Sequence, residues 1–115
     1  MLIDVRYNAV SCKPEFSKSR LKEYLEANGI RYLHVRELGV PRTVRNRLIE
    51  TGDYEWFFRW YDDNVIAAQT ERLNELLALD CPFVIMCAEP EPFRCHRARI
   101  AEWLREKGFE VYDLR

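Results

Sequence analysis

The segment from Cys87 to Arg97 concentrates the residue types that are best able to do chemistry. It reads Cys-Ala-Glu-Pro-Glu-Pro-Phe-Arg-Cys-His-Arg. Cys95 is expected at the start of a helix and close to Arg97, where the helix dipole and a nearby positive charge both favour a thiolate. These features predict a nucleophilic thiol at Cys95 or Cys87, with His96 as acid or base and Glu89 as the group that orients it or takes a proton.

The same residues also have a purely structural interpretation. Cys87 ends an apolar run and is typical of a small buried core residue, and Cys95 can pack beneath its helix. His96, Arg97 and Glu89 would then cap the helix or form ion pairs. The sequence leaves both interpretations open.

A metal site is the third interpretation, because thiols, imidazoles and carboxylates are all metal ligands. Cys95 and His96 are adjacent at a helix start and point in different directions, and none of the four cysteines forms a CxxC pair. We therefore expect no metal and no other cofactor.

The elements that must position this segment alternate between strands and helices. Apolar or alternating runs predict strands over 2–6, 30–35, 83–87 and 109–114. Helical spacing predicts helices over 18–28, 41–49 and 54–79, and a further helix that begins near Cys95. Gly29 and Gly108 stand where the first and last of these helices should end in a left-handed residue.

This alternation predicts an α/β fold with a small, mostly parallel sheet of about four strands and helices on both faces. The strand order does not follow from the sequence. The chain has 115 residues, of which 48% are hydrophobic, so we expect a single domain over residues 1–115. No apolar run approaches a membrane span and no secretory signal fits the start, so we expect a cytoplasmic protein with reduced thiols and no membrane partner.

Ligands of open parallel sheets bind where the strands end and the loops lead into helices. This rule brings the segment after Cys87 together with the ends of the first two strands. The residues it gathers there are Asp4 and Arg6 with the loop 8–13, and His34 and Arg36 with Leu38 and Gly39. We interpret Asp4, Arg6, Arg36, Leu38, Gly39 and Arg97 as ligand-binding residues.

The charge pattern favours an anionic ligand. The net charge is only -1, but residues 1–47 carry ten basic and five acidic side chains, whereas residues 48–93 carry two and ten. Arginine supplies most of the basic residues, and its planar fork suits phosphate. We interpret Arg42, Arg45 and Arg47 as a solvated helix face, with phosphate contact as the alternative.

A set of short motifs resembles the family called domain of unknown function 488. These motifs are Asp4-Val5-Arg6, Leu38-Gly39, Cys87-Ala-Glu89 and Cys95-His96-Arg97. The resemblance implies a small α/β domain of prokaryotic type with no established reaction, and it adds Ser11 to the site residues. It also implies a short form, because family members usually have a further strand and helix before Asp4. The sheet edge left uncovered in this way predicts a homodimer.

Three functions stay open at this point. The first is an anion-binding pocket in which Cys95 or Cys87 acts with His96 on a phosphate-bearing or other anionic substrate. The second is a nucleic-acid or nucleotide binding module without catalysis, supported by the basic ends of the chain and its aromatic residues. The third is a structural or partner-binding subunit in which the motifs only fix loops.

Overall fold

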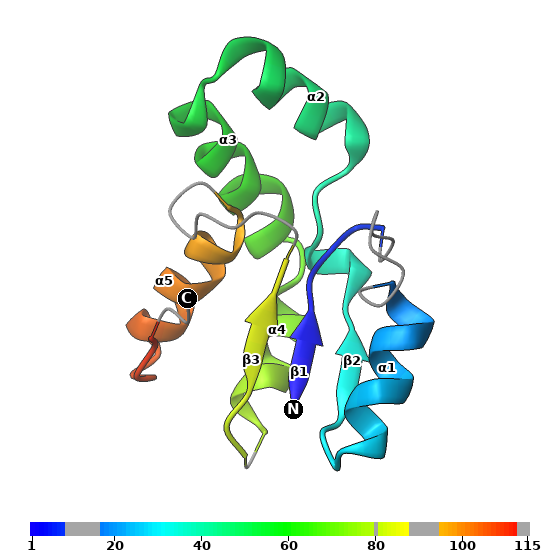
Figure 1. Cartoon of the computed structure of the whole chain (residues 1–115). Coiled ribbons are helices and arrows are strands. Elements are labelled where there is room, and N and C mark those ends of the chain that lie inside the picture. Colours follow the sequence, from blue (N-terminus) through cyan, green and yellow to red (C-terminus); the bar gives the residue numbers. More distant parts are fainter. Residues whose placement is uncertain (9–16, 80, 88–94, 113–115) are drawn as a thin grey trace.

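Three short parallel strands form the sheet of this protein (Figure 1). The computed structural model describes residues 1–8, 17–79, 81–87 and 95–112. The strands β1 (Leu2–Asp4), β2 (Tyr32–His34) and β3 (Val84–Met86) lie in the order β2-β1-β3. The first strand in the sequence is therefore the central one, and the residues that follow it lie between the ends of the other two.

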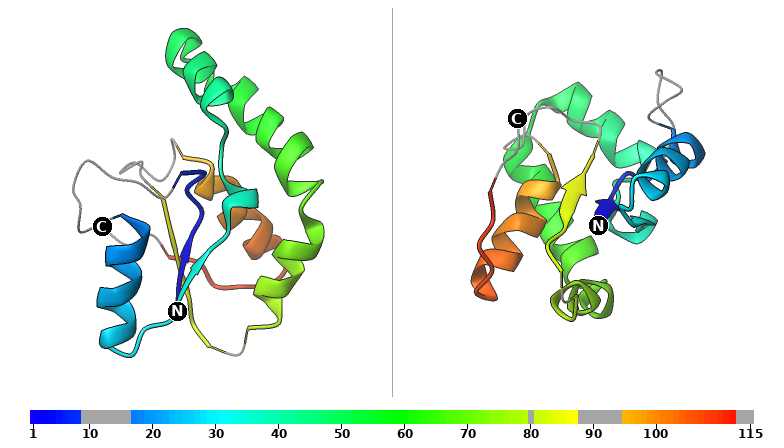
Figure 2. Two further views of the ribbon diagram at one scale, coloured as in Figure 1. Left: turned by 90° about the vertical axis from the view of Figure 1, so that its right-hand side faces the viewer. Right: turned by 60° about the horizontal axis from the view of Figure 1, so that its bottom comes forward.

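Helices cover both faces of the sheet, as the sequence predicts. Helix α1 (Lys18–Ala27) lies on one face, and α4 (Thr70–Leu77) and α5 (Arg97–Glu106) lie on the other (Figure 2). Helices α2 (Arg42–Thr51) and α3 (Tyr54–Tyr61) extend beyond the carboxyl ends of the strands (Figure 1). None of the helices in these described residues is long and apolar enough to cross a membrane.

The ends of two helices match the expected glycine signals. Gly29 follows α1 with φ +77°, and Gly108 follows α5 with φ +92°. These backbone angles lie in the left-handed region that glycine adopts without steric cost. Both helices consequently stop where the sequence predicts.

The fourth strand predicted over 109–114 is not confirmed. Residues 109–112 belong to no strand, and residues 113–115 lie outside the described residues. The Val111 carbonyl accepts a hydrogen bond from Arg105 Nη2 at 3.5 Å, and the Phe109 ring packs against Phe83 with centroids 6.4 Å apart. The segment is therefore held to α5 and to the start of β3 by these contacts instead of by a strand ladder.

The long helix predicted over 54–79 is interrupted in the structure. After α3 comes a π-helical segment, η3 (Asp62–Ile66), in which the Ala67 N–H bonds to the Asp62 carbonyl five residues back. A turn over 67–69 then separates η3 from α4. Thr70 Oγ1 donates to the Ile66 or Ala67 carbonyl at this turn. The apolar residues keep their helical spacing on both sides of this break. The sequence pattern alone therefore predicts one continuous helix.

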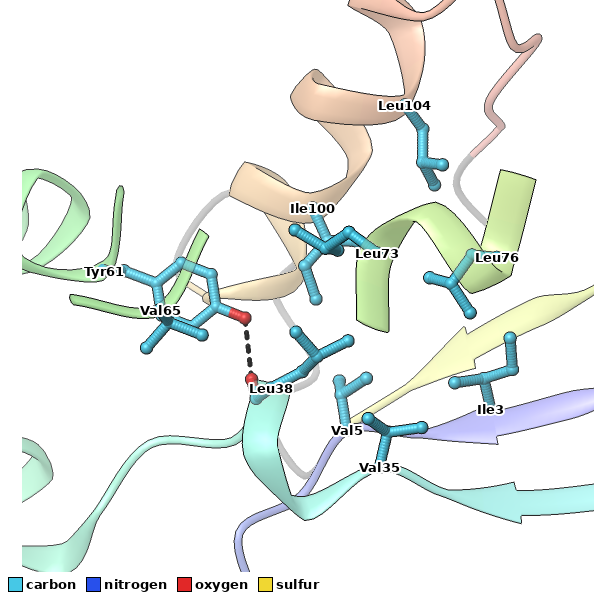
Figure 3. Close-up of a cluster of buried hydrophobic side chains, with 10 residues drawn as sticks. All are labelled: Ile3, Val5, Val35, Leu38, Tyr61, Val65, Leu73, Leu76, Ile100 and Leu104. Atoms are coloured by element: carbon cyan, nitrogen blue, oxygen red, sulfur yellow. Dashed lines mark hydrogen bonds between the residues drawn. The ribbon is translucent and has the colours of Figure 1, made fainter. Parts of the chain in front are cut away.

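The core lies between the sheet and the helices η3, α4 and α5 (Figure 3). Among the described residues buried in this core cluster, Tyr61 is the one with a polar side-chain group. Its buried hydroxyl donates to the Leu38 carbonyl at 2.6 Å. Leu38 belongs to the short 3-10 helix η2 (Arg36–Leu38), so this bond fastens η2 to the helical layer. The other buried members are Ile3, Val5, Val35, Leu38, Val65, Leu73, Leu76, Ile100 and Leu104.

Candidate functional site

A cavity of about 590 Å³ lies beside the carboxyl ends of β1 and β3. The sheet supplies the residues that follow β1 and the thiol that follows β3. Helices α2 and α3 supply the facing wall, and the start of α5 supplies Cys95 and His96. The described lining consists of Arg6, Tyr7, Asn8, Val40, Arg42, Arg45, Asn46, Leu48, Ile49, Gly52, Tyr54, Phe57, Cys87, Cys95 and His96.

The charged residues in this lining are all arginines. Arg6 comes from the segment after β1, and Arg42 and Arg45 come from the first two turns of α2. None of the described residues that line the cavity is an aspartate or a glutamate. Guanidinium groups can donate paired hydrogen bonds to carboxylate or phosphate.

Asp4 and Arg6 form a buried ion pair. Asp4 Oδ1 accepts from Arg6 Nε at 2.8 Å, and Asp4 Oδ2 accepts from Arg6 Nη2 at 2.6 Å. The Arg6 backbone N–H and the Tyr32 hydroxyl also donate to this carboxylate. Burial alone would raise the pKa of Asp4, but the hydrogen bonds from Arg6 and Tyr32 outweigh it and hold that pKa below its usual value. Asp4 therefore positions Arg6, and only Arg6 lines the cavity.

Two histidines bind successive carbonyl groups of the backbone that follows β1. His96 Nε2 lies 3.0 Å from the Val5 carbonyl, and His34 Nε2 lies 2.7 Å from the Arg6 carbonyl. A carbonyl oxygen only accepts hydrogen bonds, so each Nε2 carries the proton. In His96 this assignment makes Nδ1 the acceptor, and Nδ1 lies 3.5 Å from Cys95 Sγ.

His96 is a neutral imidazole at physiological pH. Its side chain is buried, and desolvation is the main cause that lowers its pKa to about 4. The positive charges of Arg45 and Arg97 lower this pKa further, while the hydrogen bond to the Val5 carbonyl raises it. His96 can accept a proton only weakly, and its clearest role is to orient and accept from the neighbouring thiol.

Cys87 and Cys95 line the same cavity and lie within interaction range of each other. Cys95 Sγ also accepts from the Arg97 backbone N–H at 3.5 Å, at the start of α5. The hydrogen bond with Cys87, burial and the charge that Cys87 can carry together raise the pKa of Cys95. This differs from the expectation that the helix start favours a thiolate at Cys95, because burial and the second thiol outweigh the backbone N–H. Cys87 is the more exposed thiol of the two.

The other residues expected to bind a ligand take positions around the cavity rather than in its described lining. Leu38 is buried in the core. A Cβ on Gly39 would lie 2.5 Å from Tyr7 Cα, so glycine is needed there for the close approach of two backbones. Arg97 contributes its backbone N–H to Cys95. Ser11 and Glu89 lie outside the described residues.

Arg36 lies in a second hollow of about 440 Å³ that is more open to solvent. Its guanidinium carbon lies 4.1 Å from the centre of the Tyr7 ring, which is a cation–π contact. Ser17, Lys18 and Ser19 at the start of α1 line the same hollow, together with His34. Arg36 is therefore separated from the thiols by the segment that contains Tyr7.

Helix α2 contributes to the lining of the cavity, which the sequence indicates only through the alternative of phosphate contact by its arginines. Arg42, Arg45 and Arg47 are all exposed, in keeping with the interpretation of a solvated helix face. Arg42 and Arg45 also line the cavity, whereas Arg47 packs over the Trp56 ring at 4.2 Å. The only sequence signal is the spacing of three residues between Arg42 and Arg45, which puts both on one helix face. Within the part of the chain that the structure describes, no group of three or more side chains is arranged to hold a metal ion.

A comparison with protein families gives one match. The model for the family described as Domain of unknown function DUF488 matches residues 1–104. No curated protein and no solved structure matches the chain. The family match covers the residues after β1, the thiol pair and the arginines of α2.

Proposed function

The chain belongs to the family described as Domain of unknown function DUF488, and we propose that it binds a small phosphate-bearing molecule in the cavity beside Cys87. The observation that carries this proposal is the charge of the lining. Arg6, Arg42 and Arg45 line the cavity, and no acidic residue is found among its described lining residues. Because Asp4 already balances the charge of Arg6, the excess positive charge of this lining comes from Arg42 and Arg45. A phosphate has the charge and the oxygen geometry to use two or three guanidinium groups at once.

The rest of the lining suits the organic part of such a molecule. Tyr54 and Phe57 lie in the lining from α3, and Leu48 and Ile49 lie there from α2. A volume of about 590 Å³ falls within the range of small-molecule sites. Aromatic rings beside arginines also favour a nucleobase, which stacks on them. A mononucleotide is therefore the first compound to test beside inorganic phosphate.

We assign the reactive thiol of this site to Cys87. It lines the cavity and is less buried than Cys95, so a bound molecule can reach it. Cys95 keeps its proton, because its pKa is raised, and it can donate that proton to a Cys87 thiolate. A neighbouring donor of this kind stabilises the charged nucleophile. The Cys95 thiol has a single proton, so Nδ1 of neutral His96, 3.5 Å away, is the alternative acceptor for it when Cys87 is protonated.

Isothermal titration calorimetry with inorganic phosphate and with mononucleotides tests the binding step. Arg45→Gln should weaken the binding about tenfold or more, because a hydrogen bond to a charged group contributes about 1.5–3 kcal/mol. Arg59→Gln is the matched control, because Arg59 pairs with Glu55 on the exposed side of α3 and does not line the cavity. Equal affinities for Arg45→Gln and Arg59→Gln, or no binding by the unmodified protein, would contradict the proposal.

A nucleic-acid ligand is separated from a small molecule by the salt dependence. Affinity for a polyanion falls steeply between low and moderate salt, in proportion to the number of phosphates contacted. We expect a shallow dependence for a mononucleotide, because its single phosphate group uses one site. A steep dependence with tighter binding of an oligonucleotide would favour the nucleic-acid interpretation instead.

A further inference from the structure

We propose that Cys87 and Cys95 are a redox-active pair that closes reversibly to a disulfide when the protein meets a small-molecule disulfide. The disulfide can form whether or not the cavity binds phosphate. It bears on the proposed function only because it would change the wall of the cavity. The two cysteines come from different elements, one directly after β3 and one directly before α5. Both nevertheless line the same cavity, and Cys87 is the neighbouring group that most strongly affects the Cys95 thiol, so the two side chains lie within interaction range of each other.

The surroundings of the pair give the two sulfurs different roles. Both line the cavity, so a disulfide reagent of low molecular weight has a route to them. Cys87 is only partly buried, and Cys95 is 3% exposed. We therefore assign the first attack to Cys87 and the second to Cys95, because an incoming reagent reaches the more exposed sulfur first.

The exchange consists of two balanced steps. Cys87 loses its proton and attacks one sulfur of the reagent, which forms a mixed disulfide and releases one thiolate that takes up a proton. Cys95 then attacks the Cys87 sulfur and releases the second thiolate. The proton of Cys95 passes to that leaving thiolate, and His96 Nδ1, 3.5 Å from Cys95 Sγ, lies beside its path. The two cysteines are oxidised by two electrons, and the reagent is reduced to two thiols.

Cys81 supplies an internal reference. It is exposed, and it lies before β3, six positions from Cys87. Cleavage after Arg94 separates the peptide of Cys87 from that of Cys95, but Cys81 and Cys87 share a peptide. Replacing Cys81 by Ser therefore assigns any link in this peptide to Cys87, and replacing Cys12 by Ser removes the fourth thiol of the chain.

The experiment treats folded protein carrying Cys12→Ser and Cys81→Ser, which leaves Cys87 and Cys95 of the four cysteines, with oxidised glutathione and follows the intact mass. We expect a loss of two hydrogens, a peptide link between Cys87 and Cys95, and full reversal by dithiothreitol. The additional substitution Cys95→Ser should stop the reaction at a glutathione adduct on Cys87, and circular dichroism should show that this variant stays folded. A stable adduct on Cys87 without closure in the presence of Cys95, or closure only after unfolding, would overturn the inference.

Binding of inorganic phosphate to the reduced and to the oxidised protein separates this inference from the proposed function. We expect the disulfide to weaken phosphate binding, because it changes the wall of the cavity beside Arg6. If reduced protein binds no phosphate but the disulfide still forms, the proposed function fails and the redox inference stands. If reduced protein binds phosphate but no disulfide forms, the redox inference fails alone.

Discussion

The buried carboxylate of Asp4 forms the ion pair that positions Arg6. Asp4→Asn removes the negative charge and leaves the guanidinium of Arg6 buried beside a neutral amide. Breaking one partner of a buried pair in this way costs about 3–5 kcal/mol of unfolding free energy. Urea denaturation at neutral pH measures this loss directly.

Tyr32→Phe is the matched variant for the same cluster. It removes only the hydroxyl that donates to Asp4 and leaves the charges in place. We expect it to cost about 1.5–3 kcal/mol, which is the range for one hydrogen bond to a charged group. If Asp4→Asn cost no more than Tyr32→Phe, Arg6 would not depend on its counter-charge, and the role assigned to Asp4 would be wrong.

The neutral state of His96 predicts how stability changes in acid. The pKa of His96 is lowered to about 4 in the folded protein, whereas an unfolded histidine has a pKa of about 6.5. Below about pH 6.5 the unfolded chain takes up a proton that the folded protein refuses, so stability is lost as the pH falls toward 4. The size of this loss is about 3 kcal/mol at most.

His96→Gln removes this titration and keeps an amide N–H that can donate to the Val5 carbonyl. We expect the unfolding free energy of the variant to change less between pH 6.5 and pH 4 than that of the unmodified protein. Chemical denaturation at several pH values measures the difference. Parallel pH profiles for the two proteins would show that His96 is not held neutral by burial.

Among the elements, η2 shows why a glycine in a motif can be structural. Gly39 follows η2 with φ -82°, an ordinary angle, so its backbone conformation is open to any residue. The Tyr7 backbone, however, lies where a Cβ would be, at 2.5 Å from both Tyr7 Cα and Tyr7 N. We expect Gly39→Ala to cost about 3 kcal/mol, because a methyl group there forces two backbone segments apart.

Gly29→Ala is the comparison for this prediction. Gly29 has φ +77°, and a methyl group added there would meet no atom within 4 Å, so the cost of the substitution comes only from backbone strain. That strain is about 1–2 kcal/mol. Thermal unfolding of both variants should rank Gly39→Ala as the less stable. The reverse order would mean that the chain relaxes easily around Tyr7.

The elements also show how far the sequence leads. Helices α1 and α5 end at glycines that the sequence marks, because the left-handed residue that stops each helix is a local requirement. The break between η3 and α4 does not follow from the sequence, because it depends on backbone hydrogen bonds around Asp62 and Thr70 that apolar spacing does not encode. The same holds for the unconfirmed fourth strand, where Arg105 binds the Val111 carbonyl.

At the scale of the whole molecule, the parallel sheet brings distant segments to one place. The rule that parallel sheets bind ligands at their carboxyl ends leads from the sequence to Arg6, Cys87, Cys95 and His96, which all line one cavity. The rule does not indicate Arg42 and Arg45, because these residues do not follow a strand directly. Helix α2 lies beside the cavity because of the direction that the chain takes after Gly39. That direction is a property of packing and not of local pattern.

The homodimer stays a prediction. Strands β2 and β3 are the outer strands of the sheet formed by the described residues, and Val84 on β3 is 43% exposed. An outer strand of this kind can pair with a second copy. Light scattering at micromolar concentration gives the mass in solution, and a monomeric mass would count against pairing.

The central claim is that an anion binds in the cavity beside a reactive Cys87. The most direct test is the rate of alkylation by iodoacetamide at each cysteine of the native protein, with and without inorganic phosphate, measured by mass spectrometry. We predict that Cys87 reacts faster than buried Cys95, and that phosphate slows Cys87 while exposed Cys81 keeps its rate. If Cys87 resists alkylation until the protein unfolds, or if phosphate leaves the rate at Cys87 unchanged relative to Cys81, the claim is contradicted.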